Sequence, residues 1–372
     1  MREYVLIIVV AAAVTYLATP LVRAVAIATN AFTPVRARDV HTTPTPRLGG
    51  VGIFVGFAAA AFVARELPFL KGVYTGGQIS GVLMGAGIIC LVGAIDDIRE
   101  LDWMTKLAGM VLAAGVMAFK GVQLLAVPFF GTSTVLPTPV LVAVTVVVVL
   151  ATANAVNFID GLDGLAAGVV AIAAFAFFIY AYSVSQTYNP PNVFSNATFI
   201  SAAVLGCCVG FLPHNFHPAR LFMGDSGALL LGLLLSAATI SLTGNVDPGE
   251  ADGGTVTAAL LPIAVPLAVL SLPFLDMLLA VVRRTRAGQK PWQPDSKHLH
   301  HRMLEIGHGH RRAVLLLYLW AALLALGTVS FAFVEGWAAA AVIAVCLAIA
   351  VALTVWLPKL PRVSDWRPSQ RL

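Results

Sequence analysis

Charged residues are scarce in this chain. Only 11% of its 372 residues are Asp, Glu, Lys or Arg, whereas 59% are hydrophobic. A soluble domain carries roughly 25% charged residues, so the composition excludes an ordinary water-soluble fold. No polar stretch is long enough to fold alone and no internal repeat is visible, so we expect one integral membrane domain over residues 1–372.

Cysteine is also rare. The four cysteines lie in apolar stretches, and their spacing fits neither a zinc site nor a disulfide framework. We therefore expect them to be small buried hydrophobic residues. They are Cys90, Cys207, Cys208 and Cys346.

Long apolar runs take the place of polar sequence. A helix needs about 20 mostly apolar residues to cross a bilayer. We count eleven such stretches, centred on 3–23, 49–65, 79–95, 104–119, 136–153, 165–183, 198–212, 227–243, 257–281, 312–333 and 338–357. The sequence predicts an all-α polytopic membrane protein with about 11 transmembrane helices. Residues 121–139, rich in β-branched residues, Gly and Pro, predict a short outer hairpin.

The basic residues predict the topology. With the N-terminus outside and the C-terminus in the cytosol, nineteen of the 23 Lys and Arg residues face the cytosol, as do all 8 histidines. This bias suits an anionic leaflet and anionic substrates. It gives no indication of nucleic-acid binding, because the charges are spread over separate loops. The expected cytosolic loops are about 24–48, 96–106, 152–165, 213–226 and 283–311.

Two acidic clusters lie in these loops. Asp96 and Asp97 adjoin at the inner end of the third stretch, and Lys106 follows. Two carboxylates 4 Å apart repel by about 4 kcal/mol at an effective dielectric of 20, which a cation or a proton relieves. Asn157, Asp160 and Asp163 are spaced by three, so on a helical turn they would share one face. Such oxygen donors suit Mg²⁺ or the donor groups of a base.

Further clusters lie in the remaining loops. Asp225, in Phe222-Met223-Gly224-Asp225, is either a helix cap or part of a ligand site, and the nearby aromatic favours a ligand. The run from Asp295 to Arg302 mixes three histidines with Lys and Arg, which favours phosphate over a metal ion. Residues 41–50 read as a turn before the second stretch. Asp276 is an ionisable group among apolar neighbours and hence a candidate functional residue.

We expect two kinds of loop at one membrane face. The acidic loops suit a metal ion, and the basic loop suits phosphate. Together they indicate a diphosphate substrate used with a metal ion, and the membrane indicates a lipid as second substrate.

The sequence resembles the polyprenyl-phosphate N-acetylhexosamine-1-phosphate transferases over nearly the whole chain. Five motifs occur in the order of that family: residues 43–50, the Asp96 pair with Lys106, residues 154–165, residues 222–227 and residues 298–302. The His-Leu-His-His-Arg pattern is similar to the GlcNAc-1-phosphate branch, whose actinobacterial members the chain resembles most, whereas the muramyl-pentapeptide branch has three consecutive histidines.

This resemblance implies transfer of GlcNAc-1-phosphate from UDP-GlcNAc to undecaprenyl or decaprenyl phosphate at the cytosolic face of the plasma membrane. The products are UMP and a lipid-linked sugar, as in the first membrane step of an envelope polysaccharide pathway. It implies Mg²⁺, for which Mn²⁺ can substitute. It allows a homodimer and leaves one-step and two-step attack open.

The resemblance also implies roles for the site residues. Asp225 and Asn157 would bind the metal ion. Asp96 and Asp97 would orient or deprotonate the lipid phosphate. The nucleotide would contact Asp160, Gly161, Leu162 and Asp163, with Phe222 stacked on uracil. The phosphates and the sugar would be held by His298, His300, His301, Arg302 and Lys106.

Two other functions fit parts of the sequence. An intramembrane aromatic prenyltransferase has an Asn/Asp-rich diphosphate motif that Asn157, Asp160 and Asp163 loosely resemble. Such an enzyme is not expected to carry residues 222–227 or 298–302. A secondary transporter would show internal repeats and polar residues at the bilayer midplane, whereas here the polar residues gather at one face. Release of UMP distinguishes the three functions.

Overall fold

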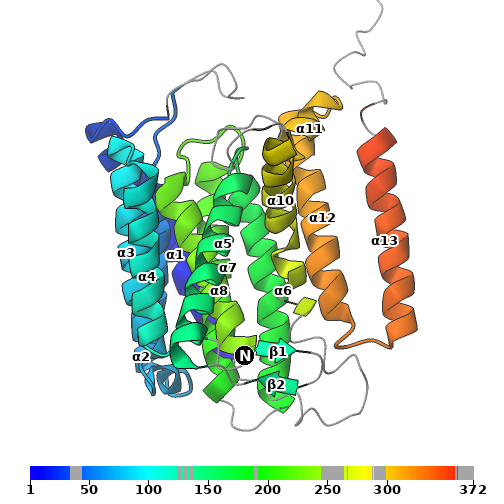
Figure 1. Ribbon diagram of the computed structural model, residues 1–372. Helices are drawn as coiled ribbons and strands as arrows, with labels where there is room; N and C mark the ends of the chain where they lie inside the picture. Colours follow the sequence, from blue (N-terminus) through cyan, green and yellow to red (C-terminus); the bar gives the residue numbers. More distant parts are fainter. Residues whose placement is uncertain are drawn as a thin grey trace, which may run out of the picture.

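The structure is a computed structural model that describes residues 1–33, 44–123, 127–129, 132–134, 137–187, 192–243, 264–265, 267–286, 288, 299–356 and 358. These residues form a bundle of long helices (Figure 1). In chain order its helices are α1 (Arg2–Ala28), α2 (Gly49–Glu66), the 3₁₀ helix η1 (Leu70–Tyr74), α3 (Gln78–Arg99), α4 (Trp103–Phe119), α5 (Thr138–Ile159), α6 (Leu165–Thr187), α7 (Asn192–Asn215), α8 (Gly224–Thr243), α10 (Ser271–Arg286), α11 (Leu299–Glu305), α12 (His310–Ser330) and α13 (Gly336–Trp356).

The prediction of an all-α polytopic membrane protein is confirmed. In the described part of the chain, 9 helices are long and apolar enough to cross a bilayer, and α4 is a shorter apolar helix. The predicted stretch 257–281 is covered in part by α10, which starts at Ser271, and most of its first half lies outside the described residues. Helices form here because a bilayer leaves no partner for the backbone other than the backbone itself.

Helix α8 lies at the centre of the bundle. It packs against α2, α3, α5, α6 and α7, and nearly all its residues are buried. Lipid offers no hydrophobic gain for helix association, so close packing through small residues has to supply the stability. Gly232 is such a residue, because a Cβ there would collide with the backbone of Ala153 in α5.

The periphery is apolar and exposed. Helix α13 stands at one edge of the bundle and leaves large side chains such as Trp337, Val342 and Leu353 uncovered (Figure 1). On α1, Leu17 and Leu21 are exposed in the same way. Because water disfavours such a surface, these outward faces indicate that lipid surrounds the bundle.

The two ends of the bundle differ. The N-terminus lies at one end together with a hairpin of β1 (Val127–Phe129) and β2 (Thr132–Thr134), paired antiparallel with Pro128 opposite Ser133 (Figure 1). The hairpin expected within residues 121–139 is therefore present. The described parts of the loops predicted to be cytosolic lie at the opposite end. Which end faces the cytosol stays a prediction.

Candidate active site

The first and fourth sequence motifs pair with each other. The Phe222 amide donates to the Pro46 carbonyl over 2.8 Å, and the amides of Gly49 and Gly50 donate to Phe222 and Met223 over 3.0 Å each. The segment before α2 thus runs beside the segment before α8 as a short parallel bridge. The described part of this motif, residues 44–50, is therefore more than a turn into a helix, because it fixes the backbone that precedes Asp225.

Asp97 caps the start of α8. Its side chain is 1% exposed and accepts hydrogen bonds from the Asp225 amide at 2.9 Å, the Ser226 amide at 3.1 Å and the Ser226 hydroxyl at 2.8 Å. A carboxylate suits a helix N-terminus, where the first amides have no partner within the helix. Gly224 makes room for it, with φ of +70° and a position where a Cβ would collide with the Asp97 carboxylate.

Arg47 joins this cap. Its Nε donates to the Asp97 carbonyl over 2.8 Å and lies 3.9 Å from the Asp97 Oδ1. The guanidinium therefore offsets part of the negative charge that Asp97 brings into the bundle. Sequence analysis placed Arg47 within a motif but gave it no role in the site.

Lys106 lies between two carboxylates. Its ammonium forms an ion pair with the Asp96 Oδ2 at 3.2 Å and a closer one with Asp225. The Leu101 amide donates to the Asp96 Oδ1 over 2.7 Å and helps to fix that side chain. The acidic pair predicted to need a cation thus has a protein ammonium beside it, and Asp96 and Asp97 point to different partners.

The residues of the third motif, Asn157, Asp160 and Asp163, do not lie on one face of a helix. Asn157 lies in the last turn of α5, which ends at Ile159, and Asp160 is its C-cap with φ −77° and ψ 55°. Asp163 follows in the turn before α6, where its carboxylate accepts from the His217 Nδ1 at 2.7 Å and the Ala219 amide at 3.0 Å. The expectation that the three residues share a helical face is therefore wrong, because the helix ends between the first and the second of them.

A cavity of about 210 Å³ opens between these segments. It brings together most of the metal and nucleotide residues that sequence analysis predicted. It is lined by Thr33, Arg47, Asp97, Asn157, Asp160, Gly161, Leu162, Asn215, Phe222, Gly224 and Asp225. Asp163 is not part of the lining, so its predicted contact with the nucleotide stays a prediction.

Negative charge is concentrated in this cavity. The pKa of Asp160 is raised to about 7, because burial disfavours its charged form and the carboxylates of Asp97 and Asp163 repel it. Asp225 and Asn157 present a carboxylate and an amide to the same space. Such oxygen donors suit a hard divalent cation, which completes its shell with water and substrate phosphates. The donor set therefore fits Mg²⁺ or Mn²⁺.

Asn215 was missed by sequence analysis. It is 2% exposed, accepts from the Gly164 amide at 3.1 Å and donates to the Leu221 carbonyl at 3.1 Å. It therefore ties the turn after α5 to the loop before α8. A polar residue that ends an apolar stretch was the available signal, but nothing in the sequence names its partners. Thr33 also lines the cavity, and nothing in the sequence around it indicated a role in the site.

The basic motif is described only in part. His298 lies outside the described residues, and His300 and His301 belong to α11, with nothing described of their side chains. Arg302 is exposed on α11. The buried Asp276 accepts from the Leu299 amide at 2.8 Å, so this candidate functional residue of α10 caps α11.

Comparison with known proteins identifies the family. Residues 79–243, which include the Asp96 pair and Asp225, match glycosyl transferase family 4. A decaprenyl-phosphate N-acetylglucosaminephosphotransferase of Mycolicibacterium smegmatis is 42% identical over 369 residues, which are 98% of this chain and 91% of that protein. The chain belongs to glycosyl transferase family 4.

Other relatives within family 4 bear two kinds of name. A probable undecaprenyl-phosphate N-acetylglucosaminyl 1-phosphate transferase of Bacillus subtilis is 33% identical, covering 81% of this chain and 77% of that protein. A phospho-N-acetylmuramoyl-pentapeptide-transferase of Desulforudis audaxviator is 34% identical, covering 80% of this chain and 87% of that protein. The resemblance drawn from the five motifs is thereby confirmed at the level of the family.

Proposed function

We propose that this chain transfers GlcNAc-1-phosphate from UDP-GlcNAc to a polyprenyl phosphate and releases UMP. One observation carries the proposal: the cavity that joins Asp97, Asn157, Asp160 and Asp225 lies in a chain 42% identical to a decaprenyl-phosphate N-acetylglucosaminephosphotransferase. That relative is more similar, at 42% identity, than the muramoyl-pentapeptide relative at 34%, which supports GlcNAc as the sugar.

The cavity suits a nucleotide diphosphate. Phe222 offers a ring on which uracil can stack. Asp160, Gly161 and Leu162 also line the cavity, where a carboxylate and backbone groups can meet the polar edge of the base. Asp163 follows them outside the lining and ties the turn to His217.

Asp225 and Asn157 would hold a magnesium ion in this cavity. Bound there, the ion would neutralise diphosphate charge and ease departure of UMP. Asp97 positions Asp225 by accepting hydrogen bonds from the backbone amides of Asp225 and Ser226. Arg47 offsets the charge of Asp97, so the start of α8 is held in place before a substrate arrives.

Lys106 and Asp96 would face the lipid phosphate. Attack joins an anionic nucleophile to an anionic diphosphate, so a cation must screen the approach. The Lys106 ammonium pairs with Asp96 and Asp225, and it would screen the approach by changing its partner from a carboxylate to a phosphate. Asp96 then remains as the carboxylate that orients the lipid phosphate or takes its proton. His298, His300, His301 and Arg302 would bind the sugar and the phosphates from α11 and the residue before it.

The test uses the purified full-length protein with Mg²⁺. UDP-GlcNAc, UDP-GalNAc and UDP-MurNAc-pentapeptide are each supplied with decaprenyl phosphate, undecaprenyl phosphate or no lipid, and UMP release is measured. We expect release only when UDP-GlcNAc and a lipid phosphate are both present. Preference for UDP-MurNAc-pentapeptide would move the chain to the other branch, and release without lipid would reject transfer to a lipid.

A second test concerns the membrane side. The excess of basic residues predicts that the loop near Gly288 faces the cytosol, and Gly288 is exposed. A Gly288→Cys variant should resist an impermeant thiol reagent in intact cells and react after permeabilisation. A cysteine placed at Lys71, at the other end of the bundle, should react in intact cells. The reverse pattern would reject the orientation.

A further inference from the structure

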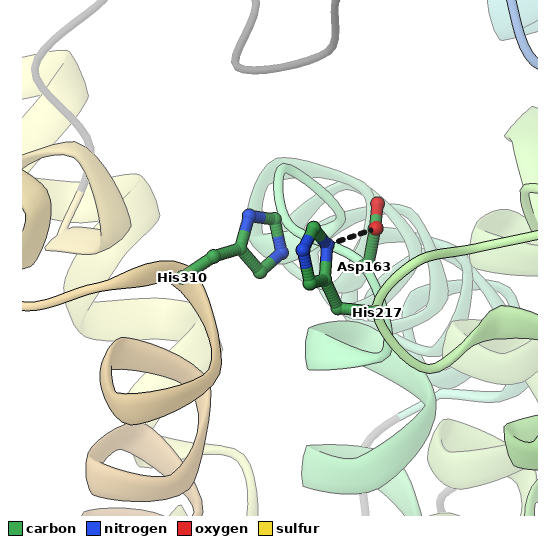
Figure 2. A group of neighbouring side chains, drawn as sticks. All are labelled: Asp163, His217 and His310. Carbon is green, nitrogen blue, oxygen red and sulfur yellow. Dashed lines mark hydrogen bonds and ion pairs between the residues drawn. The ribbon is translucent and has the colours of Figure 1, made fainter. Parts of the chain in front are cut away.

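Three side chains from distant parts of the sequence meet outside the cavity lining (Figure 2). Asp163 comes from the turn between α5 and α6, His217 from the loop between α7 and α8, and His310 is the first residue of α12. The His217 Nδ1 lies 2.7 Å from the Asp163 Oδ2, and the two imidazole rings stack with centroids 4.1 Å apart. Neither histidine has a role in the proposed transfer.

The donor set matches a transition-metal site. One ligand atom from each side chain lies within 4.8 Å of the other two. In a tetrahedral zinc site with Zn–N bonds of about 2.0–2.1 Å, neighbouring ligand atoms are roughly 3.3 Å apart. The three atoms, now within 4.8 Å of one another, would have to draw together to such a separation when an ion binds. Two imidazoles and a carboxylate suit Zn²⁺ or Co²⁺ better than Mg²⁺, which prefers an all-oxygen shell.

We propose that Asp163, His217 and His310 bind a transition-metal ion of the Zn²⁺ class. The surroundings support the arrangement. The Ala219 amide fixes the Asp163 carboxylate over 3.0 Å. Arg311, the residue after His310 on α12, donates to the His217 carbonyl over 3.1 Å, so its charge is directed to the backbone. The His217 side chain is 38% exposed, so an ion can reach it without unfolding of the bundle.

A metal ion here would join α12 to two segments that carry the candidate active site. Asp163 directly follows the cavity wall formed by Asp160 to Leu162, and His217 lies five residues before Phe222. α12 already contacts this turn, because the Tyr318 hydroxyl donates to the Gly164 carbonyl. The bound ion would therefore fasten α12 to the back of the nucleotide wall and leave the Asp225 site free.

The test reads metal binding without substrate. Purified full-length protein is stripped with a chelator and titrated with Co²⁺, followed by visible absorption, and with Zn²⁺, followed by bound metal per chain and by melting temperature. We expect one tightly bound ion per chain that excess Mg²⁺ does not displace. His217→Gln, His310→Gln and Asp163→Asn should each weaken binding by at least about tenfold, because changing even an outer-shell partner of a ligand costs about 10–100-fold.

His214→Gln is the matched control. This variant removes an imidazole three residues before His217. The His214 imidazole contacts the Tyr16 carbonyl and does not belong to the proposed metal site. Binding should persist in this variant and in His300→Gln/His301→Gln. Loss of the ion in that double variant with retention in His310→Gln would overturn the proposal, as would displacement by Mg²⁺ or absence of binding.

The metal site and the proposed transferase activity can fail separately. UMP release in Mg²⁺ without any Zn²⁺ binding would reject only the metal site. Zn²⁺ binding that depends on His310, without UMP release from any donor, would reject only the transferase.

Discussion

Helices α8 and α13 are both apolar but occupy opposite environments. The membrane-length segment of α13 has the higher mean hydropathy, 2.8 against 1.6, yet only 11% of it is buried within the protein, whereas 89% of the α8 segment is. The more hydrophobic helix is thus the one that faces outward. In a bilayer the solvent is itself apolar, so hydropathy measures contact with lipid, and protein packing is achieved by small residues.

The N-terminal ends of α13 and α8 also differ in how their acidic residues are surrounded. α13 begins next to Glu335, an exposed carboxylate that accepts from the Trp337 indole nitrogen at 2.7 Å. α8 begins with Asp225, whose amide is capped by Asp97 and whose carboxylate pairs with Lys106. Two acidic helix starts therefore have different surroundings, and that of α8 opens into a cavity.

The largest expected effect follows from exchanging the carboxylate at each helix start. Asp225→Asn keeps the shape of the side chain and removes its charge, so diphosphate charge would lose a counterion site. Loss of one such electrostatic contact costs roughly 2.7–4 kcal/mol, or about 10²–10³ in turnover. UMP release should fall by that factor. Melting temperature should change little, because Asp97 supplies the helix cap.

Glu335→Gln is the control for this exchange, because glutamine can still accept from Trp337. It should leave turnover and melting temperature unchanged. Near-normal turnover of Asp225→Asn across a range of Mg²⁺ concentrations would remove Asp225 from the metal site.

A smaller effect is expected from one methyl group in each helix. Gly232→Ala in α8 would press a Cβ into the backbone of Ala153, whereas Gly336→Ala in α13 would place it in open space. Overpacking of a tight interior costs about 1–3 kcal/mol. The melting temperature of Gly232→Ala should drop clearly, and that of Gly336→Ala should not. Equal melting temperatures would show that α8 and α5 can separate without loss of stability.

The contrast also explains what sequence could predict. Helix positions follow from apolar runs, so α1–α8, α12 and α13 agree with the predicted stretches to within six residues at either end. The site motifs were visible because carboxylates, Asn and His at the ends of apolar runs are costly without a function. That Asp225 lies in the first turn of α8 could be predicted from the sequence around it.

Contacts between distant segments could not be predicted in this way. The spacing of Asn157, Asp160 and Asp163 indicated one helical face, but α5 ends at Ile159. Asp163 contacts His217, which is 54 residues away in the sequence. Phe222 hydrogen-bonds to Pro46, which is also far from it in the sequence. Such pairings depend on how the helices pack, and hydrophobic periodicity contains little information about them.

The smallest expected effect concerns the pH dependence of stability at the cavity end. The pKa of Asp160 is about 7 in the folded protein, above the ordinary value of 3.8. Between these values the folded state binds more protons than the unfolded state, so stability falls as pH rises from about 4 to about 7. In Asp160→Asn this contribution is absent. The melting temperature of the variant should therefore decline less than that of the wild type between pH 5 and 8, as measured in one detergent without nucleotide.

Asn154→Ala, a neutral exchange on α5, is the control: it can shift the whole curve but should leave its slope unchanged. Parallel curves for Asp160→Asn and the wild type would show that Asp160 is ionised throughout, and the negative charge of the cavity would then need a bound cation even before the substrate arrives.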